Sequence, residues 1–119
     1  MRDFVKASKA LSDETRLRIM NLLLERECCV CEVMQALQIS QTRASRNLSV
    51  LHDAGFLKMR KDGLWSLYSL DNKSMDDYMI GMVDSVRKAM EKNKLAMIDR
   101  ERLRRAERVG PGCAGKLVK

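Results

Sequence analysis

The stretch from residue 40 to residue 52 most constrains the fold, because it combines an apolar helical face with a polar one. Ala44, Leu48 and Leu51 are spaced at i, i+4 and i+7, so they line one side of a helix. Such a helix would suit a DNA major groove, although an ordinary solvated surface helix shows the same pattern. The opposite side carries side chains that reach base edges and phosphates, none of them acidic: Gln41, Thr42, Arg43, Ser45, Arg46, Asn47 and Ser49.

The preceding residues favour the DNA-binding interpretation. Residues 28–37 carry a stripe of apolar side chains and predict a helix. A tight connection follows, and Ser40 can cap the next helix. A helix, a short turn and a polar-fronted helix together form the helix-turn-helix arrangement.

The following residues predict a wing. Residues 56–70 alternate with period two around Asp62-Gly63, which is a strong hairpin signal. Arg60 and Lys61 lie near the tip of this hairpin, where positive charge can contact the DNA backbone or the minor groove. A plain stabilising hairpin is the alternative, but its position directly after the polar-fronted helix favours the wing.

The two ends of the chain predict a dimer. Residues 2–10 form a short amphipathic helix, and apolar positions repeat at helical spacing from residue 75, so that the last helix could run to about Val109. So long a helix has no partner within this small chain for its whole apolar stripe, and a two-fold dimer supplies one. The expected fold is mainly α with a small β-hairpin: a winged helix-turn-helix that dimerises through its terminal helices.

Length and composition suit one domain of 119 residues, which we expect to span residues 1–109, followed by a flexible tail over 110–119. The net charge of +7 lies entirely in residues 87–119, which carry 11 basic and 4 acidic residues. No apolar run approaches the roughly 20 residues of a membrane span, and the first residues lack a signal-peptide core. We therefore expect a cytoplasmic protein that does not interact with membranes.

Three of the four cysteines, Cys28, Cys29 and Cys31, crowd into four positions beside the helix-turn-helix. In a reducing cytosol they are better explained as ligands or sensors than as disulfides. Thiolates are soft ligands, and a three-sulfur set fits trivalent arsenic or antimony better than cadmium or lead. Zinc would normally need four ligands, and the single histidine lies elsewhere. Burial as small hydrophobes and a thiol-oxidation sensor remain alternatives.

Helical geometry makes this cluster a plausible switch. Cys28 and Cys31 share a face at i and i+3, whereas Cys29 and Cys31 are about 200° apart on an ideal helix. One ion can bind all three only if the first turn of the helix distorts, which would displace the recognition helix that follows. Cys113 in the tail is a further candidate ligand.

With these residues in place, the chain resembles the ArsR/SmtB family of winged-helix metalloregulators, specifically its arsenic-responsive repressors. The segment SDETRLRIMNLLLERECCVCEVMQAL resembles the family's second helix and the Cys-Val-Cys start of its third. ISQTRASRNLSVLHDAGFL resembles its recognition helix, with Asn47 where histidine is usual, and RKDGLWSLYSL resembles its wing. The resemblance covers roughly residues 1–105.

The resemblance implies that Cys29 and Cys31 are the ligands of the Cys-Val-Cys motif. Met34 occupies the place of a frequent third cysteine, so the third sulfur must come from Cys28 or Cys113. The family's other metal site needs a histidine on the last helix, and this chain has none there. The family also implies a homodimer that represses an operon for arsenic efflux or reduction and is released by arsenite.

We therefore expect a repressor that binds double-stranded operator DNA as a homodimer, without a cofactor, and releases it when trivalent arsenic or antimony binds the cysteines. A cadmium-, lead- or redox-sensing repressor of the same fold is the alternative. A thiol enzyme or metal carrier is disfavoured, because no general base is evident near the thiols and the helix-turn-helix and wing would be left unexplained.

Overall fold

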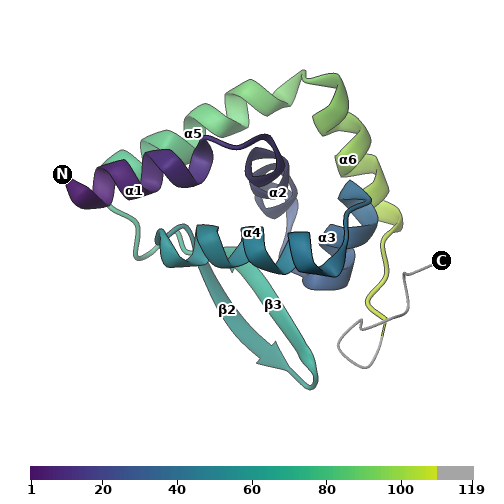
Figure 1. Cartoon of the computed structure of the whole chain (residues 1–119). Helices are drawn as coiled ribbons and strands as arrows, with labels where there is room; N and C mark the ends of the chain where they lie inside the picture. Colours follow the sequence, from purple (N-terminus) through teal and green to yellow (C-terminus); the bar gives the residue numbers. More distant parts are fainter. Residues whose placement is uncertain (110–119) are drawn as a thin grey trace.

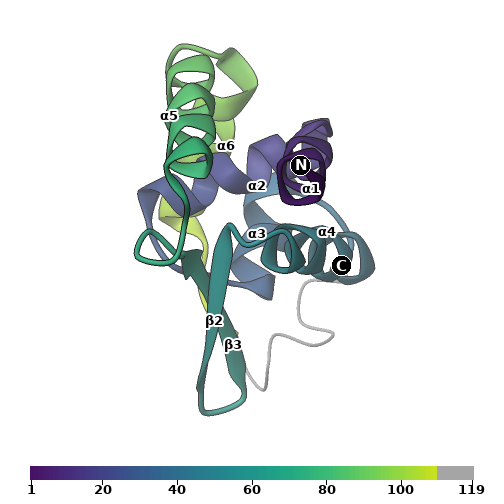
Figure 2. The same ribbon diagram turned by 90° about the vertical axis from the view of Figure 1, so that its left-hand side faces the viewer.

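The computed structural model describes residues 1–109, so the expected tail over 110–119, with Cys113, lies outside the described residues. The helices enclose α2, and the β2–β3 hairpin projects from the helical body in both views (Figures 1 and 2). No helix among the described residues is long and apolar enough to cross a membrane. The elements are α1 (Arg2–Leu11), α2 (Glu14–Glu25), β1 (Cys28–Cys29), α3 (Val30–Leu37), α4 (Gln41–Asp53), β2 (Leu57–Asp62), β3 (Trp65–Leu70), α5 (Asp77–Glu91) and α6 (Lys94–Arg105).

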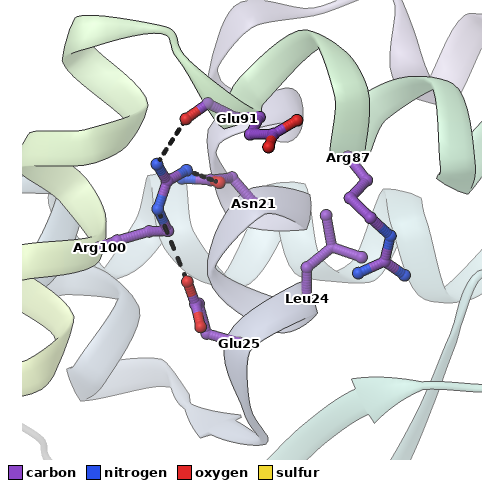
Figure 3. A pocket seen from close by; sticks show the side chains of 6 residues that line it. All are labelled: Asn21, Leu24, Glu25, Arg87, Glu91 and Arg100. Carbon is purple, nitrogen blue, oxygen red and sulfur yellow. Dashed lines mark hydrogen bonds and ion pairs between the residues drawn. The ribbon is translucent and has the colours of Figure 1, made fainter.

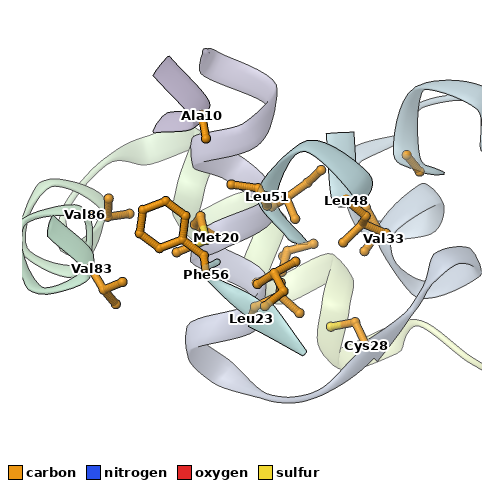
Figure 4. Packing of buried hydrophobic residues seen from close by; sticks show 14 of the residues in the cluster. Ala10, Met20, Leu23, Cys28, Val33, Leu48, Leu51, Phe56, Val83 and Val86 are labelled. Atoms are coloured by element: carbon orange, nitrogen blue, oxygen red, sulfur yellow. The ribbon is translucent and has the colours of Figure 1, made fainter. Parts of the chain in front are cut away.

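The core forms where α2 meets α4 and the residues that follow α4. Leu48 and Leu51 of α4 are fully buried with Met20 of α2 and Phe56, as Figure 4 shows. The predicted apolar face of α4 is therefore confirmed. Gly55, with φ of 97°, takes the left-handed conformation expected after this helix.

The hairpin is confirmed as a wing-like structure, but it belongs to a three-stranded sheet in the order β1-β3-β2. Asp62 pairs with Trp65, so the turn consists of Gly63 and Leu64, and Gly63 takes the positive φ of 62°; the signal located the hairpin, with its turn one residue later than Asp62-Gly63. β1 adds the third strand, because Cys28 pairs with Tyr68 and Cys29 with Leu67. The predicted helix over 28–37 is therefore wrong at its start, since α3 begins at Val30.

The prediction of one long last helix is also wrong. α5 ends at Glu91, and α6 begins at Lys94 after Asn93, whose Oδ1 accepts a hydrogen bond from the Ala96 N–H. α6 folds back onto α2 because polar side chains of the two helices find their hydrogen-bond partners across this contact. Arg18 makes two hydrogen bonds to the buried carboxylate of Asp99, at 2.7 and 2.9 Å.

Arg100 extends this attachment of α6. Its guanidinium donates to Oδ1 of Asn21 at 2.7 Å and to the carbonyl oxygens of Met90 and Glu91. Arg100 is one of the residues that line a small cavity of about 240 Å³, as Figure 3 shows. These bonds occupy the Arg100 donors, so we assign the cavity to the joint between α2, α5 and α6.

Candidate functional site

The sulfur atoms of Cys29 and Cys31 lie 2.8 Å apart at the start of α3. Cys29 is the residue before the first helical turn, in an extended conformation with φ of −89° and ψ of 171°. Because Cys29 lies outside the helix, the angular spacing of helical residues does not apply to it. The expected separation of about 200° between Cys29 and Cys31 is therefore wrong, whereas the prediction that one ion can bind all three cysteines only after the first turn distorts stays a prediction.

Glu32 holds this arrangement in place. Its Oε1 accepts a hydrogen bond from the Cys29 N–H at 2.9 Å and from Nε of Arg108 at 3.1 Å, and its Oε2 accepts from Arg26 at 2.7 Å. Although the carboxylate is buried, which opposes ionisation, these donors lower the pKa of Glu32. Sequence reasoning missed Glu32, yet its position three residues after Cys29 is the spacing of a capping box.

Cys28 lies apart from the Cys29–Cys31 pair. Its side chain is fully buried in the main core near Leu23 and Val33, as Figure 4 shows, whereas Cys29 and Cys31 pack with Leu67 in a separate cluster. Burial raises the pKa of the Cys28 thiol to about 12, and burial also raises the pKa of Cys29. The structure thus brings together two of the three clustered cysteines.

No group of three histidine, cysteine or carboxylate side chains within residues 1–109 is placed to hold a metal ion. Within the described residues, Cys29 and Cys31 therefore provide two sulfur atoms to the candidate site. The candidate ligand Cys113 lies outside the described residues. The described chain ends close to this site, because Val109 packs against the cluster formed by Cys29, Cys31 and Leu67.

A pocket of about 230 Å³ lies between Cys29 and the two predicted DNA-binding elements. Its lining comes from the start of α3, the first turns of α4 and the wing. A ligand held by Cys29 would therefore touch the junction of these three elements. The lining residues are Cys29, Val30, Gln41, Ser45, Leu64, Trp65, Ser66 and Tyr68.

On α4, the predicted contact residues divide into two groups. Ser40 caps the helix by accepting from the Arg43 N–H, as expected. Asn47 faces inward, since its Oδ1 accepts from Arg16 at 3.0 Å and its Nδ2 donates to the carbonyl of Arg43. Ser45 is half-buried, and the exposed members are Gln41, Thr42, Arg43 and Arg46.

Both predicted wing residues are exposed. Arg60 makes two hydrogen bonds to the carboxylate of Glu27, at 2.9 and 2.7 Å, and Lys61 donates to the Ser66 hydroxyl at 2.8 Å. The Arg60 side chain lowers the pKa of Glu27. Arg60 thus joins the wing to the loop that leads into β1.

The terminal helices expose apolar side chains. Phe4 and Val5 of α1 and Ile80 of α5 are 51%, 43% and 46% exposed, and the ring of Phe4 lies 5.4 Å from that of Tyr78. An apolar groove of about 360 Å³ runs between α1, α2 and α5. A surface of this kind fits a second copy of the chain. The groove is lined by Ser8, Leu11, Leu17, Met82, Ser85, Val86, Ala89 and Met90.

Comparison with known proteins identifies related sequences. Residues 13–59 match the family model described as bacterial regulatory protein, arsR family. The chain is 44% identical over 72 residues to the cadmium resistance transcriptional regulatory protein CadC homolog of Staphylococcus aureus, covering 60% of each chain. It is 46% identical over 67 residues to the arsenical resistance operon repressor of Escherichia coli, covering 56% of this chain and 57% of that one.

A third relative is matched over most of its length. The chain is 37% identical over 79 residues to an uncharacterized HTH-type transcriptional regulator of Methanocaldococcus jannaschii, covering 66% of this chain and 88% of that one. By contrast, the chain spans only 57% to 63% of the first curated relatives. These relatives are named as regulators, not as enzymes.

Solved structures show the same fold. Reduced HlyU from Vibrio cholerae is 27% identical with a TM-score of 0.63, covering 74% of this chain and 88% of that chain. The homodimeric winged helix-turn-helix domain Mb0332 from Mycobacterium bovis is 24% identical with a TM-score of 0.64, covering 78% of this chain and 82% of that chain. The second match supports the winged helix-turn-helix architecture alone.

Proposed function

The chain belongs to the arsR family of bacterial regulatory proteins, and we propose that it is a homodimeric repressor released from operator DNA by trivalent arsenic or antimony. The proposal is carried by the 2.8 Å approach of the Cys29 and Cys31 sulfurs directly beside the wing and α4. Trivalent arsenic and antimony bind thiolates strongly, and a reducing cytosol, which we expect for this chain, favours the thiol form of cysteine.

The third sulfur of the proposed site could come from Cys28 or from Cys113. Cys28 would have to leave the main core and break the pairing of β1 before it could join Cys29 and Cys31. Val109 packs against the cluster that contains Cys29, Cys31 and Leu67, and Cys113 follows Val109 by four residues in the sequence, a span of up to about 13 Å in an extended chain. These positions support Cys113 over Cys28 as the third ligand of the proposed site.

The proposed release mechanism uses the position of Cys29. This residue ends β1, pairs with Leu67 of the wing and precedes the first turn of α3. An ion that draws the sulfurs together would shift this joint, and with it the angle between the wing and α4. Linkage requires the ion to bind the shifted, DNA-incompetent state more tightly than the DNA-binding state.

Operator binding is assigned to the exposed face of α4 and to the wing. Gln41, Thr42, Arg43 and Arg46 are placed to reach bases and phosphates, with Ser45 beside them. Arg60 and Lys61 would contact the backbone from the wing. In a dimer built on α1 and α5, the two recognition helices would enter successive major grooves about 34 Å apart.

The test is an operator-binding titration, by fluorescence anisotropy, with arsenite, antimonite, cadmium and lead compared side by side. Arsenite should raise the dissociation constant for the operator, and Cys29→Ser or Cys31→Ser should abolish this response while leaving inducer-free binding intact. Cys28→Ser is the matched control, because the same change is made one residue away on a side chain in the main core. If Cys113 is the third ligand, Cys113→Ser should weaken the response to arsenite, and Cys28→Ser should leave that response unchanged.

Other results would favour other functions. A response to cadmium or lead but not to arsenite would favour the cadmium-sensing alternative, which the identity to the Staphylococcus regulator also supports. Release by peroxide alone would favour a redox sensor. The absence of any salt-dependent binding to duplex DNA would remove the repressor proposal.

A further inference from the structure

The segment after α6, residues 106–109, crosses the start of α3. The main chain of Glu107 forms a two-way pair with the side-chain amide of Gln35, whose Nε2 donates to the Glu107 carbonyl at 2.6 Å and whose Oε1 accepts from the Glu107 N–H at 3.1 Å. The same Nε2 also donates to the carbonyl of Cys31 at 3.1 Å. Gln35 therefore links the backbone of this segment to the backbone of a sulfur residue.

The next two residues are held by other elements. Nε of Arg108 donates to Glu32, the carboxylate that also accepts from the Cys29 N–H. The carbonyl of Val109 accepts from Nε1 of Trp65, in the first position of β3, at 3.0 Å. Three consecutive residues, 107 to 109, thus bind α3 twice and the wing once.

We propose that residues 106–109 form a clasp that closes the sulfur site and joins it to the wing, and that Gln35 is the positioning residue that holds the clasp. The inference rests on the proposed function, because it concerns how the inducer is retained at Cys29 and Cys31. While the clasp is docked, its bonds to Gln35, Glu32 and Trp65 keep residues 107–109 against α3 and the wing, beside the sulfur site, and so limit the escape of an inducer held there.

The Gln35 amide is the most informative place to test the clasp. Gln35→Ala removes the two-way pair with Glu107 but keeps both sulfurs, and alanine favours the helical conformation that α3 requires. Glu101→Ala is the control, because Glu101 lies on the exposed surface of α6 and pairs with Arg104 and Arg105. Trp65, the single tryptophan, reports docking through its bond to Val109.

The experiment uses the full chain and has two readouts. In acrylamide quenching without inducer, Trp65 should be more accessible in Gln35→Ala than in the wild type or Glu101→Ala. In the operator titration, Gln35→Ala should need about tenfold more arsenite for half-release, because two hydrogen bonds of the clasp are gone. Its inducer-free operator affinity and its thermal midpoint should stay close to those of Glu101→Ala, which a purely structural role of Gln35 would not allow.

The outcomes separate the clasp from the proposed function. If the wild type is released by arsenite and Gln35→Ala is released at the same concentration, the clasp is overturned and the proposed function stands. If arsenite does not release the wild type, the proposed function fails, and the role of the clasp in inducer binding fails with it. Unchanged quenching of Trp65 in Gln35→Ala would also overturn the clasp.

Discussion

Removal of the Asp99 carboxylate should detach α6 from α2. Asp99 is fully buried and accepts two hydrogen bonds from the guanidinium of Arg18, whose side chain is 19% exposed. Asp99→Ala leaves that guanidinium without its partner in a largely dry environment. Breaking a buried ion pair from one side costs roughly 3–5 kcal/mol, and the partial exposure of Arg18 argues for about 3 kcal/mol.

The assay is thermal and urea unfolding of the full chain. For a domain of this size, about 3 kcal/mol corresponds to a decrease of about 10–15 °C in Tm. Glu101→Ala is the matched control: it removes a carboxylate two residues away on the same helix, where Arg104 and Arg105 are its partners on an exposed surface. Such exposed pairs contribute about 0–1 kcal/mol, so the Tm of Glu101→Ala should stay close to that of the wild type.

A double substitution tests the reasoning further. Arg18→Met combined with Asp99→Ala removes both charges, so it should recover part of the stability that Asp99→Ala alone loses. If Asp99→Ala costs no more than Glu101→Ala, the buried pair does not hold α6 in place. The argument for why the last helix folds back would then be refuted.

Three further predictions concern the recognition helix and the inducer. Gly55→Ala should lower the free energy of unfolding by about 1–2 kcal/mol, because Gly55 has φ of 97° and an added Cβ would lie 3.3 Å from Met79 Cε. Urea titrations measure this change, and an unchanged midpoint would contradict it. Asn47→Ala should weaken binding to the operator and to an unrelated duplex by the same factor, about threefold to tenfold. Its amide binds Arg16 of α2 and so holds α4 in position, rather than contacting a base. A loss confined to one base pair would make Asn47 a base contact instead. A dithiol chelator added after arsenite should restore operator binding in the anisotropy assay, and failure to restore it would indicate irreversible damage rather than reversible coordination.

The sequence predicted α4 and the wing because both depend on local signals. The apolar spacing of Ala44, Leu48 and Leu51 defines a helical face, and the Asp62-Gly63 signal marks the hairpin, whose two-residue turn is Gly63-Leu64. These signals act over fewer than ten residues and need no knowledge of the rest of the chain. The same holds for the left-handed Gly55 after α4.

The parts that were missed depend on partners distant in sequence. The two-residue strand β1 exists because Cys28 and Cys29 pair with residues 67 and 68, and apolar spacing cannot reveal such a pairing. The break between α5 and α6 was hidden because apolar positions continue across it, while Asp99 finds Arg18 81 residues away. Glu32 could have been found, since Cys29 and Glu32 have the spacing of a capping box.

The energetics of release favour a third sulfur from outside the core. To reverse operator occupancy from 99:1 to 1:99, the inducer must bind the DNA-incompetent state about 10⁴-fold more tightly, a difference of about 5.5 kcal/mol. Small shifts of Cys29 in its pairing with Leu67 exchange hydrogen bonds that contribute about 1 kcal/mol each, which is too little. A sulfur that coordinates in one state and not in the other contributes a whole bond to the difference. Cys28 cannot supply such a bond without leaving the main core, which favours a donor outside that core.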